Sequence, residues 1–300
     1  MEKIIECIPN FSEGRDLKKI EKIVDAFRAK ENLKLLDYSN DKDHNRMVVT
    51  AIGEPEAMKR AVIEAVGIAV EEIDLTKHQG QHPRIGAIDV VPFVPIKGIT
   101  LREADDLAKE VAASMAQKYV LPVFLYEQSA SAEHRKNLAV IRKGEFEGLN
   151  VKMKAPEWKP DFGPAERHPT AGAVVVGARN PLIAFNVNLN TDRFEIAEKI
   201  AKRIRYIGGG LRCCKAIGID LKEKKQVQVS VNLTDFTQTS LYQVFEMIRF
   251  EAQRYGVSIA GSELIGLLPL QAAVDTVAYY LQLENFSAKR IIETNSHPIL

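Results

Sequence analysis

The chain alternates short apolar runs of strand length with longer segments whose apolar residues recur at helical spacing. Residues 4–8 form the first apolar run, and the segment 16–30 places Leu17, Ile20 and Phe27 on one face of a helix. Similar short and long segments follow one another to the end of the chain. This alternation predicts a protein of the α/β (α+β) class.

A polar turn separates two of the apolar runs. Residues 33–37 and 47–52 have the pattern of strands, and the turn at 39–45 between them leaves no room for a helix. Strands joined by a short turn run antiparallel, whereas parallel strands need a longer crossover, usually a helix. We therefore expect the first half of the chain to contain a mixed sheet.

The other predicted elements continue the alternation. The remaining predicted helices span 55–70, 100–119, 192–206, 241–255 and 269–283. The remaining predicted strands span 88–94, 120–126, 173–176, 182–189, 211–217, 227–233 and 257–260. A charged stretch at 132–149 also has a helical pattern, and three prolines in 153–164 mark a linker or a crossover. The second half therefore repeats the α/β organisation on a smaller scale.

Length and composition indicate an ordinary globular protein. With 300 residues and 46% apolar content, the chain can bury one large core or two modest ones. Apolar stretches such as 171–178 are much shorter than the roughly 20 residues that cross a bilayer. The charged N-terminus lacks the apolar region of a secretory signal. We expect a cytoplasmic protein with no membrane partner.

Cysteines and charge exclude two further classes. The chain has three cysteines, and Cys213 and Cys214 are adjacent, which gives neither a disulfide framework nor paired CxxC ligands. The net charge is +1, and no basic run is interleaved with aromatic residues. We therefore expect no nucleic-acid partner.

The segment 78–89 contains two histidines that are four residues apart. On a helix, His78 and His82 would share one face, as in zinc sites. Gly80 and Pro83 disfavour a helix there, and no glutamate stands beside the first histidine. We therefore predict no metal site.

The same segment favours acid–base chemistry. Arg84 and Asp89 lie close in sequence, and a histidine held by a carboxylate is a suitable general acid or base near neutral pH. The alternative is that both histidines are exposed polar residues of a loop. The local sequence leaves open which histidine would act.

Other polar segments are candidates for ligand binding. After the first strand, Asn10, Ser12 and Arg15 are candidate ligand donors, although Ser12 could instead cap the next helix. The loop 162–172 is rich in turn residues and is long enough to wrap a ligand or to serve as a crossover. Neither segment has the Gly-Lys-Ser/Thr pattern of a phosphate loop.

A basic segment and two asparagines are further candidates. Residues 199–219 contain six basic residues and no acidic one around three glycines, which suits a carboxylate or phosphate ligand or a solvated helix face. Asn186 and Asn188 alternate along a strand, so both amides should face the same side of the sheet.

Taken together, six motifs in one order resemble the formiminotransferase domain family over nearly the whole chain. They are residues 7–14 (CIPNFSEG), 78–89 with the core HPRIGA, 161–164 (DFGP), 177–179 (GAR), 184–189 (AFNVNL) and 266–270 (GLLPL). The resemblance implies two α/β sandwich subdomains with mixed sheets and a substrate cleft between them. It places the catalytic histidine in an N-terminal subdomain over 1–180, and a C-terminal subdomain over 181–300 completes the folate site.

The resemblance also implies an activity and a set of site residues. The activity is transfer of a formimino group between N-formiminoglutamate and tetrahydrofolate, a co-substrate, with no metal and no covalent cofactor. His82 corresponds to the family's catalytic histidine. The implied folate contacts are Gly163, Pro164, Ala165, Glu166, Arg167, His168, Pro169, Thr170, Ala171, Gly172, Gly209, Gly210 and Leu211.

The chemistry suggests roles for individual residues. His82 would take the proton from N5 of the folate and deliver one to the departing glutamate nitrogen, with an aspartate or backbone acceptors fixing its tautomer. Arg84 or Arg15 would hold a substrate carboxylate. Two alternatives stay open: transfer of a formyl group from N-formylglutamate, and folate binding without catalysis. We also expect a homodimer and, with no residues after Leu300, no cyclodeaminase activity.

Overall fold

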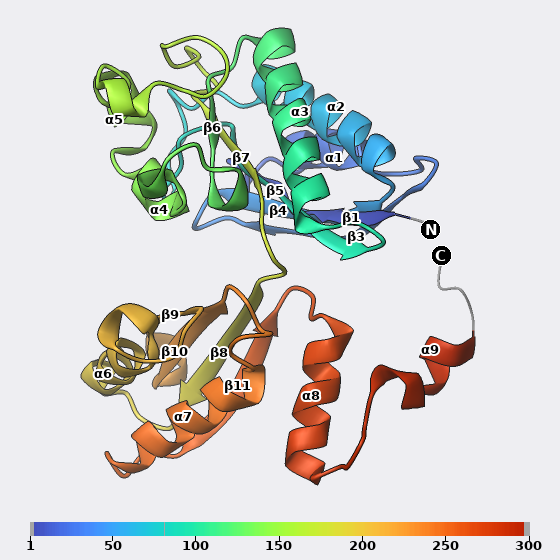
Figure 1. Cartoon of the computed structure of the whole chain (residues 1–300). Coiled ribbons are helices and arrows are strands. Elements are labelled where there is room, and N and C mark those ends of the chain that lie inside the picture. The colour runs from blue at the N-terminus through green and yellow to red at the C-terminus, as the bar shows by residue number, and fades with distance from the viewer. Residues whose placement is uncertain (1–2, 81, 297–300) are drawn as a thin grey trace. The chain divides into compact units, whose positions relative to one another are not determined.

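Residues 3–80 and 82–296 are described by the computed structural model, and their backbone divides into two units between Arg179 and Asn180 (Figure 1). Each unit has its own sheet and its own buried apolar cluster. The predicted α/β class with two subdomains is confirmed.

The described part of the first unit contains a seven-stranded sheet. Its strands are β1 (Ile4–Cys7), β2 (Asn10–Phe11), β3 (Leu33–Asp41), β4 (Arg46–Gly53), β5 (Ile88–Lys97), β6 (Val123–Leu125) and β7 (Val174–Ala178). Strand β4 pairs with β3 on one side and with β1 and β2 on the other, and β5, β7 and β6 follow. The pairs β5–β7 and β6–β7 are parallel and the others are antiparallel, so the predicted mixed sheet is confirmed here.

Three helices cover one face of this sheet: α1 (Leu17–Asp25), α2 (Pro55–Glu72) and α3 (Leu101–Tyr119). Their starts follow local rules, since Asp16 caps α1, a proline begins α2, and Thr100 and Glu103 form a capping box on α3. The prediction that the first helix reaches residue 30 was too long. Ala29 has a φ of +48°, a left-handed conformation that cannot continue the helix.

A smaller cluster covers part of the opposite face. Helices α4 (Leu138–Arg142) and α5 (Glu145–Lys152) pack there over Phe124 and Val175. The helical pattern over 132–149 corresponds to these two short helices and not to a continuous one, because Gly144, with a φ of +92°, separates them. The proline-rich segment 153–164 belongs to the connection between the parallel strands β6 and β7, so it is a crossover and no domain linker.

The second unit is built on the strands β8 (Ile183–Leu189), β9 (Cys214–Leu221), β10 (Gln226–Leu233) and β11 (Ile259–Ile265). Their order is β11-β8-β10-β9, and every pairing in the described residues is antiparallel. The prediction of a mixed sheet therefore fails in this unit. The strands that a helix connects, β8 with β9 and β10 with β11, run parallel to each other but are not neighbours, because another strand lies between them. This is the arrangement of a β-α-β-β-α-β motif.

Helices α6 (Phe194–Ile204) and α7 (Leu241–Gln253) supply most of the helical part of the second core. Phe185, Val187 and Leu189 of β8 belong to the same cluster. Helix α8 (Leu270–Leu281) and the short α9 (Ile292–Ser296) follow β11. Among residues 3–80 and 82–296, no helix combines the length and apolarity that a membrane crossing requires.

Candidate active site

Asp89 lies at a β-bulge in the first sheet. Asn10 of β2 pairs with Val90, but the next residue, Phe11, pairs with Ile88, which leaves Asp89 as an extra residue on β5. A bulge redirects a side chain, and here the buried carboxylate accepts a hydrogen bond from the backbone N–H of Ile85 at 3.1 Å. The bulge therefore directs an acid toward the loop that contains His82.

Arg142, the last residue of α4, supplies the charge opposite Asp89. Its Nη2 donates to Asp89 Oδ2, and Asp89 is 1% exposed. Burial raises the pKa of Asp89, but Arg142, His82 and the Ile85 N–H together bring that pKa below its ordinary value. Asp89 is therefore a carboxylate at neutral pH.

Lys152 fixes the end of α4. Its Nζ donates to the carbonyl oxygens of Val140 at 2.8 Å, Ile141 at 2.6 Å and Lys143 at 3.1 Å. A cation that binds the last carbonyls of a helix compensates acceptors that have no partner within the helix. Lys152 thereby holds the backbone on both sides of Arg142.

His82 lies between Asp89 and Arg46, and its side chain is 14% exposed. Nε2 is 3.7 Å from Asp89 Oδ2, beyond hydrogen-bond distance, and has no closer partner among the described residues. Nδ1 is 3.5 Å from Nη1 of Arg46, which can only donate. This arrangement favours the tautomer with the proton on Nε2, facing Asp89, and the lone pair on Nδ1.

The surroundings of His82 keep its imidazole neutral. Burial lowers the pKa of His82, Asp89 opposes that shift, and the charges of Arg46 and Arg142 lower the pKa further. The net direction is below the ordinary histidine value. A neutral imidazole at pH 7 can accept a proton, so His82 meets the requirement for a general base.

His78 has a different environment. Its Nε2 is 2.9 Å from the backbone oxygen of Asn45, and its Nδ1 accepts a hydrogen bond from Arg84 Nε at 3.3 Å. Burial lowers its pKa, so the ring is neutral and both nitrogens have protein partners. His78 therefore links the loop to the start of β4, which gives it a structural role.

Arg84 is also engaged by the protein itself. Its guanidinium lies 2.7 Å from Glu145 and 2.7 Å from Glu147, and its side chain is only 8% exposed. These two carboxylates belong to α5. The ion pairs therefore tie the loop that carries His78 and His82, called the histidine loop below, to that helix. The predicted role of Arg84 as a carboxylate receptor would require these pairs to open.

The loop 163–172, which the family resemblance assigns to folate, lies against the histidine loop. Backbone N–H groups of Leu75 and Ala87 donate to Thr170 and Ala171, each at 2.9 Å. The Ala173 N–H donates to Ile85 at 3.0 Å. Two segments that are far apart in the sequence thus form one surface in the first unit.

Gly172 allows this close approach. Its φ is +72°, and a Cβ at that position would lie 2.1 Å from the Ile85 carbonyl oxygen. We predict that Gly172→Ala destabilises the protein by about 1–2 kcal/mol for the left-handed backbone, plus the cost of displacing Ile85. Gly256→Ala is the matched control, because Gly256 has a φ of +65° in open space. Urea unfolding should show a larger loss for Gly172→Ala, and equal losses would contradict the close-contact argument.

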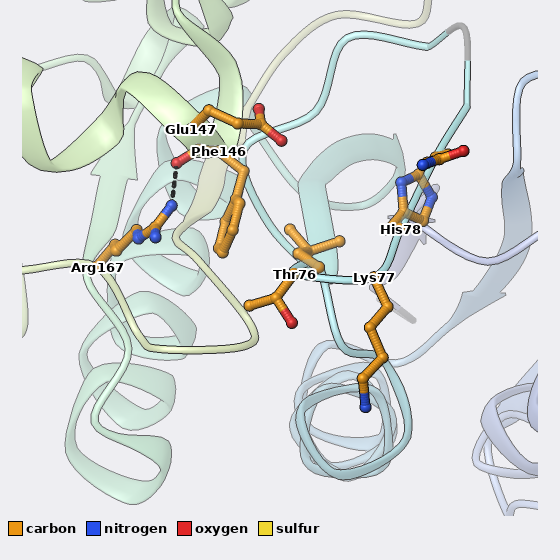
Figure 2. A pocket seen from close by; sticks show the side chains of 8 residues that line it. Thr76, Lys77, His78, Phe146, Glu147 and Arg167 are labelled. Atoms are coloured by element: carbon orange, nitrogen blue, oxygen red, sulfur yellow. Dashed lines mark hydrogen bonds between the residues drawn. The ribbon is translucent and has the colours of Figure 1, made fainter.

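Arg167 of this loop lines a pocket of about 500 Å³ together with Lys77, His78 and Glu147 (Figure 2). Its Nη1 donates to the Phe146 carbonyl oxygen at 2.6 Å, and its guanidinium lies 3.9 Å from the centroid of the Phe146 ring. The pocket therefore combines residues of the histidine loop, α5 and the predicted folate loop.

The candidates near the first strand are partly structural. Asn10 donates to Ile8 O at 3.0 Å, and Arg15 donates to Lys42 O at 2.8 Å. Ser12 does not cap α1, because Asp16 occupies the cap; its hydroxyl donates to Gly86 O at 2.7 Å. Ser12 thereby connects this segment with the histidine loop.

The candidates of the second unit lie on two features. Gly209 has a φ of +84°, and the N–H groups of Gly210 and Leu211 donate to Arg205 O and Ile204 O in the turn after α6. Asn186 and Asn188 lie on the face of β8 opposite its core residues; Asn186 donates to Glu263 at 3.4 Å, and Asn188 accepts from Gln228 at 2.8 Å.

Two of the six basic residues in the segment 199–219 have acidic partners from outside it. Lys202 lies 3.0 Å from Glu198, and Arg203 lies 3.5 Å from Glu251. Lys199, Arg212 and Lys215 are exposed to solvent. The local positive charge is therefore smaller than the sequence indicates.

Arg46 and Arg142 were not identified as site residues from the sequence. Arg46 begins β4 and Arg142 ends a five-residue helix, and no local pattern relates either residue to position 82. For metal ions, residues 3–80 and 82–296 contain no group of three or more His, Cys, Asp or Glu side chains suited to bind one.

Comparisons with known proteins cover both units. Residues 4–179 match the formiminotransferase domain, N-terminal subdomain, and residues 184–296 match the formiminotransferase domain. A glutamate formimidoyltransferase of Streptococcus pyogenes serotype M1 is 50% identical over 296 residues, which is 98% of this chain and 99% of that protein. One from Thermoplasma acidophilum is 42% identical, over 97% of this chain and 96% of that protein. A formimidoyltransferase-cyclodeaminase of Mus musculus is 42% identical over 95% of this chain and 53% of its own length.

Proposed function

The chain belongs to the formiminotransferase domain family, and we propose that it is a glutamate formimidoyltransferase. The reaction moves the formimino group between N-formiminoglutamate and tetrahydrofolate, and its products are 5-formiminotetrahydrofolate and L-glutamate. The observation that best supports this activity is the half-buried, neutral His82 beside the ionised Asp89.

His82 serves this reaction as general base and then as general acid. N5 of the folate attacks the amidine carbon, and Nδ1 of His82 takes the proton that N5 loses. The glutamate nitrogen leaves when the same ring returns a proton to it. Asp89, on the Nε2 side, stabilises the imidazolium that exists between these two transfers.

The loop 163–172 is proposed to hold the folate. Its contacts with residues 85–87 support this role, since they bring the loop next to the segment that carries His82. By family resemblance, Gly209, Gly210 and Leu211 of the second unit are further proposed folate contacts. Homodimerisation and a cytoplasmic location belong to the same proposal.

A parallel assay of two donors tests the proposed activity. Purified protein is incubated with tetrahydrofolate and either N-formiminoglutamate or N-formylglutamate, and the folate products are separated by chromatography. We expect a higher kcat/KM with the formimino donor. Faster transfer from the formyl donor would replace the proposed substrate, and folate binding without turnover of either donor would exclude catalysis.

A further inference from the structure

Arg46 carries a charge that the described residues do not neutralise directly. No carboxylate of these residues lies within ion-pair distance of its guanidinium, and its Nη1 lies 3.5 Å from His82 Nδ1. Asp41 is its partner across the β3–β4 pair, but that carboxylate accepts from the N–H groups of Asp43 and His44, each at 2.9 Å. The other Asp41 oxygen lies 2.6 Å from the His44 ring.

The charge balance around His82 is positive. Arg46 and Arg142 contribute two guanidinium groups, His82 is neutral, and Asp89, bonded to Arg142, is the carboxylate beside them. Burial and the neighbouring Arg142 lower the pKa of Arg46 by more than Asp89 and Asp41 raise it, which reflects the unfavourable environment of its charge. A partly buried cation without a paired anion is costly, so this position suits an anionic group of a ligand.

We propose that Arg46 binds the α-carboxylate of the formimino donor beside His82. This inference rests on the proposed function, because that function identifies the donor. In N-formiminoglutamate, the α-carboxylate carbon is two bonds from the nitrogen that leaves, whereas the γ-carboxylate carbon is four bonds away. Because Arg46 lies next to the histidine that protonates this nitrogen, the α-carboxylate is nearer to its guanidinium than the γ-carboxylate is.

The same contact prepares His82 for catalysis. A 3.5 Å contact between Arg46 and Nδ1 is at the limit of a hydrogen bond, whereas a guanidinium and a carboxylate form two short parallel bonds. When the donor binds, Arg46 turns to the carboxylate and leaves the Nδ1 lone pair free. Binding of the donor thus also exposes the lone pair of the base. A donor without an α-carboxylate would lack the contact with Arg46 and would leave Nδ1 of His82 next to Arg46.

Arg46→Met tests this role, because methionine keeps much of the apolar stem and removes the charge. We expect the KM for N-formiminoglutamate to rise on the order of 10- to 100-fold, with the KM for tetrahydrofolate unchanged. Arg60→Met is the matched control, since Arg60 is exposed on α2. Thermal unfolding of each variant checks the fold. If Arg46→Met does not fold, Arg46→Lys, which keeps a positive charge, is used in its place. Arg46→Lys should then raise the same KM, because an ammonium cannot form the two parallel bonds.

A donor analogue isolates the α-carboxylate. N-formimino-4-aminobutyrate lacks only this group. The wild-type protein should therefore use it with a kcat/KM that is lower than for N-formiminoglutamate by about the factor expected for Arg46→Met. With this analogue, Arg46→Met should have a kcat/KM no lower than that of the wild-type protein. The proposal would be overturned if Arg46→Met left the KM for N-formiminoglutamate unchanged. It would also be overturned if the substitution lowered kcat/KM for the analogue as much as for N-formiminoglutamate.

Binding without turnover separates this proposal from the proposed function. By calorimetry, the wild-type protein should bind L-glutamate more tightly than 4-aminobutyrate, and Arg46→Met should lose that difference. If the wild-type protein turns over neither donor, the proposed function fails while this comparison still decides the role of Arg46. Equal affinities of the wild-type protein for the two ligands would refute the carboxylate contact.

Discussion

Replacing His82 with alanine is expected to reduce the rate of formimino transfer by about 10²- to 10⁴-fold. The reason is that this imidazole is the group proposed to take the proton from N5 and to return one to the glutamate nitrogen. The measurement is kcat with both substrates saturating, accompanied by a test of folate binding. A variant with nearly wild-type turnover would exclude His82 as the acid–base group.

His78→Gln provides the matched control for this experiment. Both histidines belong to the same loop, but the nitrogens of His78 are engaged by Asn45 and Arg84. We therefore expect His78→Gln to lower kcat far less than His82→Ala does, although it should lower the unfolding midpoint. A larger loss of kcat for His78→Gln would reverse the assignment of the two histidines.

The pH dependence of kcat/KM gives a second measurement of His82. Burial and the two arginines lower its pKa, and the base must be neutral to accept a proton. Activity should therefore fall on the acidic side with a midpoint below the ordinary histidine value of about 6.5. Arg46→Met removes one of these cations, so it should move this midpoint upward. A midpoint well above 6.5 in the wild-type protein would contradict the neutral imidazole.

Replacing Arg142 with methionine is expected to destabilise the protein by about 3–5 kcal/mol at neutral pH. The substitution leaves the Asp89 carboxylate, 1% exposed, without its cation. The free energy of unfolding in urea measures this effect. Lys143→Met is a suitable control, because the neighbouring Lys143 side chain is exposed, and it should change stability little.

The destabilisation should depend on pH in a defined direction. In the wild-type protein the pKa of Asp89 is below its ordinary value, so its contribution to stability is present at neutral pH and is lost as the pH falls through that lowered pKa. Without Arg142, burial should raise the pKa of Asp89. The difference between Arg142→Met and wild type should then shrink from pH 7 to pH 4, as Asp89 takes up a proton.

A double substitution separates charge burial from packing. Asp89→Asn combined with Arg142→Met removes both charges, so it should be less destabilising than Arg142→Met alone. If the double variant is as unstable as the single variant, the loss comes from packing of the arginine stem, and the argument from the buried charge fails.

Much of the architecture follows from local patterns. The α/β class and most strands and helices could be predicted, because apolar periodicity reports which face of an element is buried. The predicted helices differed from the observed ones where the backbone conformation of a single residue interrupts a helix. The first helix ends at Asp25, and the left-handed Ala29 keeps it from reaching residue 30; Gly144 separates two short helices in the region 132–149, although the apolar pattern continues.

The antiparallel sheet of the second unit illustrates a further limit. The order of strands and helices along the chain is the same whether a crossover joins adjacent strands or strands with another between them. Strand β10 lies between β8 and β9, and β8 lies between β10 and β11. This insertion is a matter of long-range pairing, which local periodicity does not report.

The residues and motifs of the chain were enough to predict the family, the α/β class, and the two loops that contain His82 and residues 163–172. The family resemblance already pointed to His82, and the structure added the physical difference, since His78 is bound by Asn45 and Arg84 whereas His82 faces Asp89. It alone brought Arg46 and Arg142 to that site. The environment of a buried charge depends on the groups that strand pairing and helix packing place around it, and both arginines come from segments far from position 82.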